Sequence, residues 1–307
     1  MSDGIKTVVV LGPSSDQGLP LIQALYEGGL TPIAAPRRLD AMAGTAFPDI
    51  ETVHADLMDV ETLKKTFEGR DAAAFSLRFT FDFDVAAQFG RNIADAAKAA
   101  NLKKVVFNTS CFVADDDLGI SAHDGRREIE RAIAASGVNY VFVEPVVFMN
   151  NISAPWCKPG ILNTKTFTYP ASETLKISWI CLEDVSRIMV AALKSDSVDR
   201  QHLPVGGPQA LTGFEIAESL SAAAGYPIRF DSITPNEFAE NMSEKVTGSR
   251  EIPPGSVYEG MAKFYAFYND QPVSPLIVDP KTITDKLPVT LTSFEDWSAG
   301  QDWSRLI

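Results

Sequence analysis

The sequence contains little cysteine and little histidine. Three of each are spread through 307 residues, at wide spacings. An odd number of distant thiols does not build a disulfide framework, and scattered histidines do not indicate a metal centre. We therefore expect Cys111, Cys157 and Cys181 to be buried or half-buried free thiols, and we predict no metal site.

Long apolar segments and an excess of positive charge are also absent. A membrane-spanning helix needs about 18 consecutive apolar residues, whereas the longest candidate, NYVFVEPVVFM, is interrupted by Glu144 and Pro145. The N-terminus MSDGIKTVVV has no secretory h-region, and the net charge of −13 repels nucleic-acid phosphate. We expect a cytoplasmic protein, monomer or homodimer, that acts on a small molecule and binds neither membrane nor nucleic acid.

The sequence does contain a regular alternation of short apolar runs and helical patterns. Nearly all-apolar runs such as VVVL indicate parallel strands that are covered on both faces. The alternation predicts an α/β fold with a Rossmann-like, doubly wound parallel sheet. The predicted strands are 6–11, 30–35, 50–56, 72–77, 103–110 and 139–145, and the predicted helices lie near 17–28, 60–68, 85–100 and 123–136.

The pattern loosens in the second half of the chain. We expect a loop over 153–173 and a strand over 175–181. The first domain is predicted to comprise 1–153 with a returning segment at about 175–205. A smaller C-terminal α/β domain is predicted to comprise 154–174 and 206–307.

The stretch LGPSSDQG follows the first predicted strand and opens the first helix. Glycines in such turns allow a positive φ and a close approach to pyrophosphate, which the helix N-terminus attracts. Read as GxxGxxG, the spacing is kept at Gly12 and Gly18, and Ser15 adds a hydroxyl that can donate to phosphate. An ordinary tight turn is the alternative, although the strand-turn-helix context favours a dinucleotide site. The predicted cofactor residues here are Gly12, Ser14, Ser15, Gln17 and Gly18.

Charged residues at the ends of the next two predicted strands fit the same hypothesis. Arg37 or Arg38 could pair with a 2′-phosphate, which favours NADP, with NAD possible; alternatively, both are solvated loop charges. Asp56, with Leu57 beside it, could accept a hydrogen bond from the adenine amino group. Equally, an aspartate near there could cap the following helix.

Several stretches, in their order and spacing, resemble the NmrA-like branch of the atypical short-chain dehydrogenase/reductases. The resemblance covers nearly the whole chain, and it implies a NAD(P)-binding Rossmann domain followed by a small substrate-binding domain. The matching stretches are VVVLGPSSDQG, HADLMDVETLKKTFEGRDA, GRREIERAIAASGVNYVFVEPVVFMNNI, ISWICLEDVSRIMVAAL, LTGFEIAESLSAAAGYPI and LTSFEDW.

The resemblance also reveals a departure at the proton-donor position. Short-chain reductases carry a tyrosine and a lysine four residues apart on one helix face, and these positions fall on Ala122 and Arg126. Arg126 can hold the nicotinamide ribose but cannot relay a proton. His123 could be the donor, because histidine titrates near neutrality. Alternatively, it is an exposed residue in the first helical turn behind a Ser121 cap.

Further residues are placed around the nicotinamide and the substrate by the same resemblance. Ser110, at a strand end, resembles the family's substrate-side serine and could orient a carbonyl, or it could satisfy the backbone there. Relatives often carry arginine where this chain has Glu144, which changes the electrostatics of that corner. The residues implied beside the nicotinamide are Pro145, Phe148, Met149 and Asn151.

Aromatic residues supply the predicted substrate walls. Phe79, in the alternating stretch RFTFDFD, could stack on a flat substrate, although such a stripe is more typical of a core. Trp156 and Tyr169 lie on the stretch that resembles a substrate lid.

The missing tyrosine bears on the reaction, because a positioned general acid is worth roughly 10²–10⁴ in rate. Quinones, conjugated enones, iminium ions and aldehydes are the predicted hydride acceptors for an NADPH-dependent reductase. Two other functions stay open: a NAD(P)-binding redox sensor without turnover, and a non-redox isomerase or cyclase.

Overall fold

The computed structural model describes residues 4–77 and 80–305, and the chain separates into two compact units. The first unit comprises Met1–Pro145, Leu182–Val205 and Lys281–Thr290, and the second comprises Val146–Cys181, Gly206–Pro280 and Leu291–Ile307. The first segment of the first unit thus ends at Pro145, whereas the sequence prediction ends it at 153. The chain re-enters this unit at Leu182, whereas the sequence prediction gives about 175. No helix that the structure describes has the length and apolar character needed to cross a bilayer.

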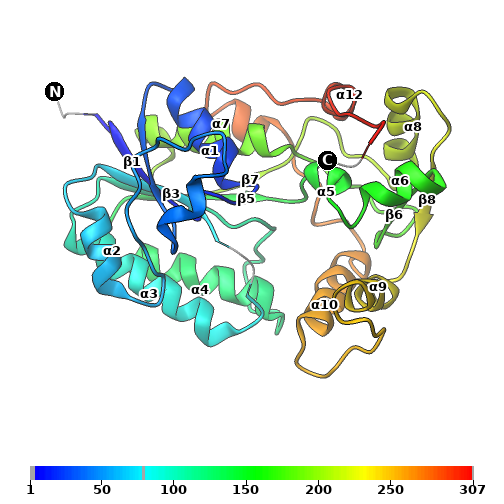
Figure 1. Ribbon diagram of the computed structural model, residues 1–307, viewed down its shortest axis with the longest axis horizontal. Coiled ribbons are helices and arrows are strands. Elements are labelled where there is room, and N and C mark those ends of the chain that lie inside the picture. Colours follow the sequence, from blue (N-terminus) through cyan, green and yellow to red (C-terminus); the bar gives the residue numbers. More distant parts are fainter. Residues whose placement is uncertain (1–3, 78–79, 306–307) are drawn as a thin grey trace. The chain divides into compact units, whose positions relative to one another are not determined.

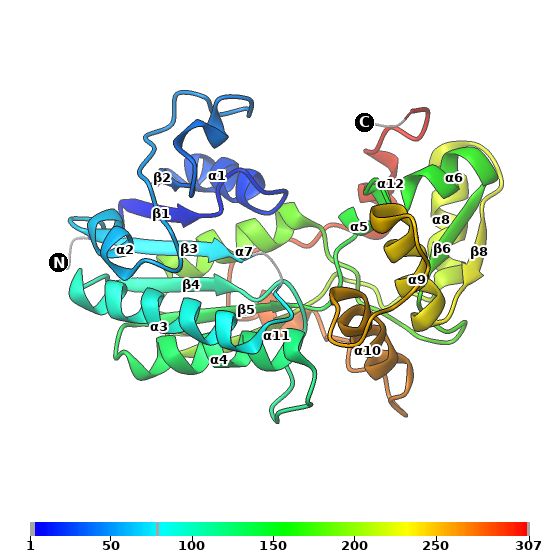
Figure 2. The same ribbon diagram turned by 60° about the horizontal axis from the view of Figure 1, so that its bottom comes forward.

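Six parallel strands form the sheet of the first unit, in the order β2-β1-β3-β4-β5-β7. Figure 2 shows the part of this order from β2 to β5. Val9, at the centre of β1, pairs with Ile33 on one side and Ala73 on the other. This arrangement confirms the predicted α/β fold with a doubly wound parallel sheet. The strand bounds are Thr7–Leu11 (β1), Thr31–Ala35 (β2), Ala72–Ser76 (β3), Lys104–Asn108 (β4), Tyr140–Pro145 (β5) and Gln201–Val205 (β7).

Helices cover both faces of this sheet (Figure 1). Helices α1 (Gly18–Glu27) and α7 (Leu182–Lys194) lie on one face, and α3 (Phe83–Ala99) and α4 (Ser121–Ala135) lie on the other, with α2 (Val60–Phe67) beside α3. Between the sheet and α4, three fully buried rings pack from neighbouring strands, each contributing about 1.5–3 kcal/mol through burial. They are Phe75, Phe107 and Phe142. The shorter helices of this unit are η1 (Leu39–Met42), η2 (Asp196–Val198) and α11 (Lys281–Thr284).

The predicted strand over 50–56 is wrong. The segment follows β2 only briefly: Val53 N donates to Ala34 O at 2.9 Å, and Ala55 N donates to Pro36 O at 3.1 Å. Only the Ala34–Thr52 pair forms a bridge. A continuing parallel ladder would need the N–H of residue 36, and proline has none.

The second unit contains a two-stranded parallel sheet of β6 (Thr166–Tyr169) and β8 (Arg229–Ser232). Its longer helices are α8 (Gly213–Ala224), α9 (Pro235–Thr247) and α10 (Val257–Asn269), and its shorter helices are α5 (Asn150–Ser153), α6 (Lys158–Thr164) and α12 (Phe294–Ala299).

Two sequence predictions for this unit are wrong. The expected loop over 153–173 contains α6 and β6, because Phe167 and Tyr169 are buried against the ring of Trp179. The expected strand over 175–181 forms only isolated bridges, Ile177 with Leu211 and Ile180 with Phe148.

Candidate functional site

The turn between β1 and α1 depends on two glycines. Gly12 has a φ of 66°, and a Cβ on Gly18 would lie 2.4 Å from the carbonyl oxygen of Gly12. The hydroxyl of Ser15 donates to that same carbonyl at 2.8 Å and accepts from the amide of Gly18 at 3.0 Å. The single hydroxyl proton of Ser15 therefore braces the turn in this structure instead of facing outward.

The N-terminus of α1 is open to an anion. The helix begins at Gly18, with no side-chain cap from Gln17 and no acidic residue in its first turn. Within the described part of the chain, no protein acceptor is found for the amides of Ser14 and Gln17. Such amides and the positive end of the helix dipole attract phosphate.

The same turn is tied to the carboxyl end of β4. Gln17 Oε1 accepts from Asn108 Nδ2 at 2.9 Å and from the hydroxyl of Ser110 at 3.0 Å. Ser110 has a positive φ of 65°, and its amide donates to Asn108 Oδ1 at 2.8 Å. Asn108 thus holds both Gln17 and Ser110 in place. It is not among the predicted site residues, although a polar amide at the end of a buried strand could have indicated it.

Arg126 extends this group of residues to β3. Its guanidinium is 3% exposed, donates to the carbonyl of Leu77 and lies 5.9 Å from the ring centre of Phe107. Burial lowers the pKa of Arg126 to about 10, so it stays charged at neutral pH. Ala122, which the sequence prediction places at the position of the family tyrosine, is buried one turn earlier in α4.

The interpretation of His123 as an exposed residue behind a Ser121 cap is wrong. The ring is fully buried, and Nδ1 lies 2.7 Å from the carbonyl oxygen of Phe112. Helix α4 starts at Ser121 itself, and its N-cap residue is Ile120. Burial lowers the pKa of His123 to about 4, so the ring is neutral at pH 7 and Nδ1–H donates to Phe112.

The two candidate arginines after β2 differ in their partners. Arg38 donates to Asp40 from Nε at 3.1 Å and from Nη2 at 2.8 Å. Arg37 is exposed, and it has no partner among the residues that the structure describes. Arg37 is therefore the side chain available to a 2′-phosphate.

The aspartates before α2 have separate structural roles. Asp56 is half-buried, and its Oδ1 accepts from the amide of Met58 at 2.9 Å. The N-cap of α2 is Asp59, whose side chain accepts from two amides of the first turn. Leu57 contributes its carbonyl to Asn92 Nδ2 at 2.8 Å.

The predicted substrate residues fall mostly in the second unit. Phe148 and Met149 are buried, Asn151 is half-buried, and Tyr169 is 2% exposed. Trp156 lines a cavity of about 240 Å³ within this unit, together with Phe238, Met242 and Lys245. Pro145 ends β5 in the first unit, and Phe79 lies outside the described residues.

The cysteine prediction is confirmed. Cys111, Cys157 and Cys181 are buried free thiols. Burial raises the pKa of Cys111 and of Cys157 to about 12. Both thiols are therefore protonated and poor nucleophiles at neutral pH.

A doubly wound parallel sheet with a glycine turn at the mouth of its first helix defines the Rossmann class of α/β proteins. The chain belongs to the NmrA-like family, whose family model matches residues 5–298. The predicted family membership is thereby confirmed.

Individual relatives share most of the chain. It is 30% identical to an NAD(P)H azoreductase of Xenophilus azovorans over 84% of this chain and 86% of that protein. Its fold matches an NADPH-dependent quinone oxidoreductase of Escherichia coli, solved with NADPH, at a TM-score of 0.76 and 18% identity, covering 95% and 98% of the two chains. The negative transcriptional regulator NmrA, solved with NADP, matches at a TM-score of 0.73 and 16% identity, and the match covers 98% of this chain and 99% of that chain.

Proposed function

We propose that this protein is an NADPH-dependent reductase that transfers hydride to a small conjugated or aromatic electrophile. The observation that carries the proposal is the uncapped N-terminus of α1 behind the Gly12–Gly18 turn. Just after β2, Arg37 is exposed and has no partner among the described residues. The azoreductase and quinone oxidoreductase relatives, by their names, act on conjugated acceptors.

The backbone amides of the first turn and the surrounding side chains have distinct roles in this proposal. The amides of the first turn bind pyrophosphate, and Arg37 binds the 2′-phosphate through charge-assisted hydrogen bonds. Gln17, Asn108 and Ser110 hold the turn against the end of β4. Arg126 places a fixed positive charge at the end of β3. NADPH, when bound, supplies the hydride.

The residues of α4 limit which acceptors suit the site. Ala122 cannot protonate a product, and the neutral His123 already uses Nδ1–H on Phe112. Simple ketones, which become strongly basic alkoxides on reduction, gain most from a general acid. Quinones, enones, iminium ions and azo compounds delocalise or neutralise the developing charge, and water can then deliver the proton. Positioning of the acceptor supplies the remaining rate enhancement.

The test is a substrate panel with purified protein, followed by loss of NADPH absorbance. We expect turnover with quinones, azo dyes or enones and at most trace activity with simple ketones. With an enone or iminium acceptor, deuterium at C4 of the coenzyme should appear on a carbon atom of the reduced product, where it does not exchange with water. Inertness towards every acceptor class, despite NADPH binding, would reject the reductase proposal.

A second candidate function is coenzyme sensing without turnover. The alanine at position 122, where the resemblance leads us to expect a tyrosine, favours it, and NmrA is a regulator by its name. The two functions predict different results in the same panel: tight NADP binding in both, but hydride transfer only in the reductase.

A further inference from the structure

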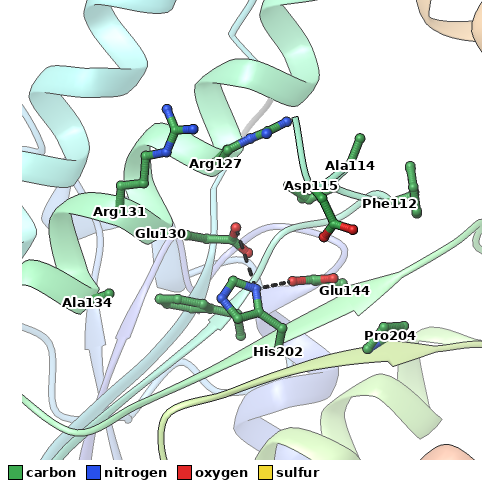
Figure 3. A pocket seen from close by; sticks show the side chains of 12 residues that line it. Phe112, Ala114, Asp115, Arg127, Glu130, Arg131, Ala134, Glu144, His202 and Pro204 are labelled. Carbon is green, nitrogen blue, oxygen red and sulfur yellow. Dashed lines mark hydrogen bonds and ion pairs between the residues drawn. The ribbon is translucent and has the colours of Figure 1, made fainter. Parts of the chain in front are cut away.

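A second polar group lies in the first unit, on the face of the sheet that α4 covers (Figure 3). Glu144 comes from β5, and His202 comes from β7, where it pairs in register with Phe142. Because side chains alternate along a strand, Glu144 lies on the same face as Phe142. Glu130 reaches this face from α4, and its carboxylate points toward the other two side chains.

The three side chains are close enough to share one ion. His202 Nδ1 lies 2.6 Å from Glu144 Oε1 and 3.9 Å from Glu130 Oε2. One ligand atom from each residue lies within 4.8 Å of the others. In a tetrahedral site with bonds of about 2.0–2.1 Å, ligand atoms stand about 3.3 Å apart. The distances from His202 Nδ1 to the two glutamate oxygens, 2.6 and 3.9 Å, lie on either side of about 3.3 Å. Small side-chain movements would therefore bring the three ligand atoms to the spacing that a bound ion requires.

The two carboxylates are deeply buried, and the positive charges of Arg127 and Arg126 offset the charge of Glu130 only in part. Their side chains are 3% and 7% exposed for Glu130 and Glu144, and Glu130 Oε1 has no hydrogen-bond partner. Burial, together with the neighbouring carboxylate of Glu144, raises the pKa of Glu130 well above its ordinary value. Two adjacent buried carboxylates need a cation or a shared proton.

The surroundings permit a cation to enter. The cluster lines a cavity of about 560 Å³, and His202 is 52% exposed on that side. Two arginines also line the cavity, and both face the carboxylate of Asp117. Arg127 Nε lies 3.6 Å and Arg131 Nη2 lies 3.5 Å from Asp117 Oδ1. Their charge therefore opposes a bound cation less than free guanidinium groups would.

We propose that Glu130, Glu144 and His202 bind one divalent transition-metal cation, Zn²⁺ foremost, with a fourth coordination position open to the cavity. The imidazole nitrogen favours Zn²⁺ over Mg²⁺ and Ca²⁺, which prefer oxygen ligands throughout. The ion takes the place of the proton now between His202 and Glu144, and it links α4 to β5 and β7.

The test titrates Zn²⁺ into tag-free, chelator-treated protein by calorimetry. We expect one ion per chain and a rise in the thermal midpoint of a few degrees when Zn²⁺ is in excess. Glu130→Gln and His202→Ala should each weaken binding at least roughly tenfold, since even outer-sphere changes cost that much. His54→Ala removes an exposed histidine outside the cluster and should bind Zn²⁺ as the wild type does.

A second measurement needs no variant. Of the three histidine rings, one should change its ¹⁵N shifts when Zn²⁺ is added to the wild-type protein, with the metal on Nδ1. A wild-type chain that binds no Zn²⁺, unchanged affinity in Glu130→Gln and His202→Ala, or three unchanged rings would each overturn the proposal. A shared proton between the two glutamates would then be the explanation of their burial.

Discussion

Arg37 and Arg38 are adjacent in the chain, yet the structure gives them different surroundings. Asp40 occupies Nε and Nη2 of Arg38, while Arg37 is exposed and has no partner within the described residues. An exposed ion pair of this kind contributes little to stability, but it does occupy the guanidinium of Arg38. The difference makes the two residues a matched pair for mutation.

Arg37→Ala should weaken NADPH binding about tenfold to a hundredfold, because hydrogen bonds to charged groups are worth about 1.5–3 kcal/mol. NADH binding should stay nearly unchanged, since NADH lacks the 2′-phosphate. Calorimetric titration with both coenzymes measures this, and Arg38→Ala is the control. An equal loss for NADH, or a larger loss in Arg38→Ala, would contradict the assignment of Arg37.

His123 has a consequence for acid stability. Its pKa is lowered to about 4 in the folded protein by burial, against about 6.5 in an unfolded chain. Between these values the unfolded chain binds the proton first. The stability is therefore fully present above about pH 6.5 and falls as the pH drops toward 4, by about 2–3 kcal/mol.

The measurement is urea unfolding at pH 7 and pH 4.5. His123→Asn keeps an amide donor near Phe112 but does not titrate, so its unfolding free energy should fall less between these pH values than that of the wild type. His54→Ala, at an exposed position, should keep the wild-type pH dependence. An equal fall in unfolding free energy from pH 7 to pH 4.5 in His123→Asn and in the wild type would show that another group controls acid unfolding.

At the scale of elements, the β1–α1 turn leaves no room for a side chain at Gly18. A Cβ there would lie 2.4 Å from the carbonyl oxygen of Gly12 and 2.6 Å from that of Pro13, so backbone must move. Gly18→Ala should therefore reduce NADPH affinity more than about tenfold and cost about 1–3 kcal/mol of stability. Gly44→Ala, where no atom lies within 4 Å, is the control for both measurements. Wild-type coenzyme affinity in Gly18→Ala would separate this turn from coenzyme binding.

Strands β1 to β5 of the first unit could be predicted because their apolar runs are local signals, whereas β7 lies outside the predicted strands. Residues 72–76 form a central strand, as the run AAAFSL predicts. The segment 50–56, which is more polar, was also predicted as a strand but fails as one, since its neighbour Pro36 cannot donate. The fold of 166–169 was missed because its aromatic residues are held by Trp179, whose position no local pattern reveals.

At the scale of the whole molecule, coenzyme binding should raise the stability of the folded chain. A ligand at about 100 times its Kd stabilises the native state by about 2.7 kcal/mol. We expect NADPH to raise the thermal midpoint by roughly 5 °C or more, and Arg37→Ala to reduce this shift at the same NADPH concentration. Hydrogen exchange should slow at the amides of Gly12 and of residues 14–18. The absence of any shift with either coenzyme would remove the basis of the proposed function.

The sequence by itself determined the alternation of strands and helices, the spacing of Gly12 and Gly18, and the family. These features depend on composition, on spacing within a few residues, or on the order of motifs along the chain. The loss of the family tyrosine at Ala122 stays a prediction from the resemblance. Only the tertiary structure decided that Ser15 and Gln17 brace the turn, that His123 is buried, and that Glu130, Glu144 and His202 meet. The physical reason is that burial and hydrogen-bond partners depend on which distant segments of the chain pack together. The fold brings together residues 17, 108 and 110 in one place and residues 130, 144 and 202 in another, although each set is widely separated in the sequence.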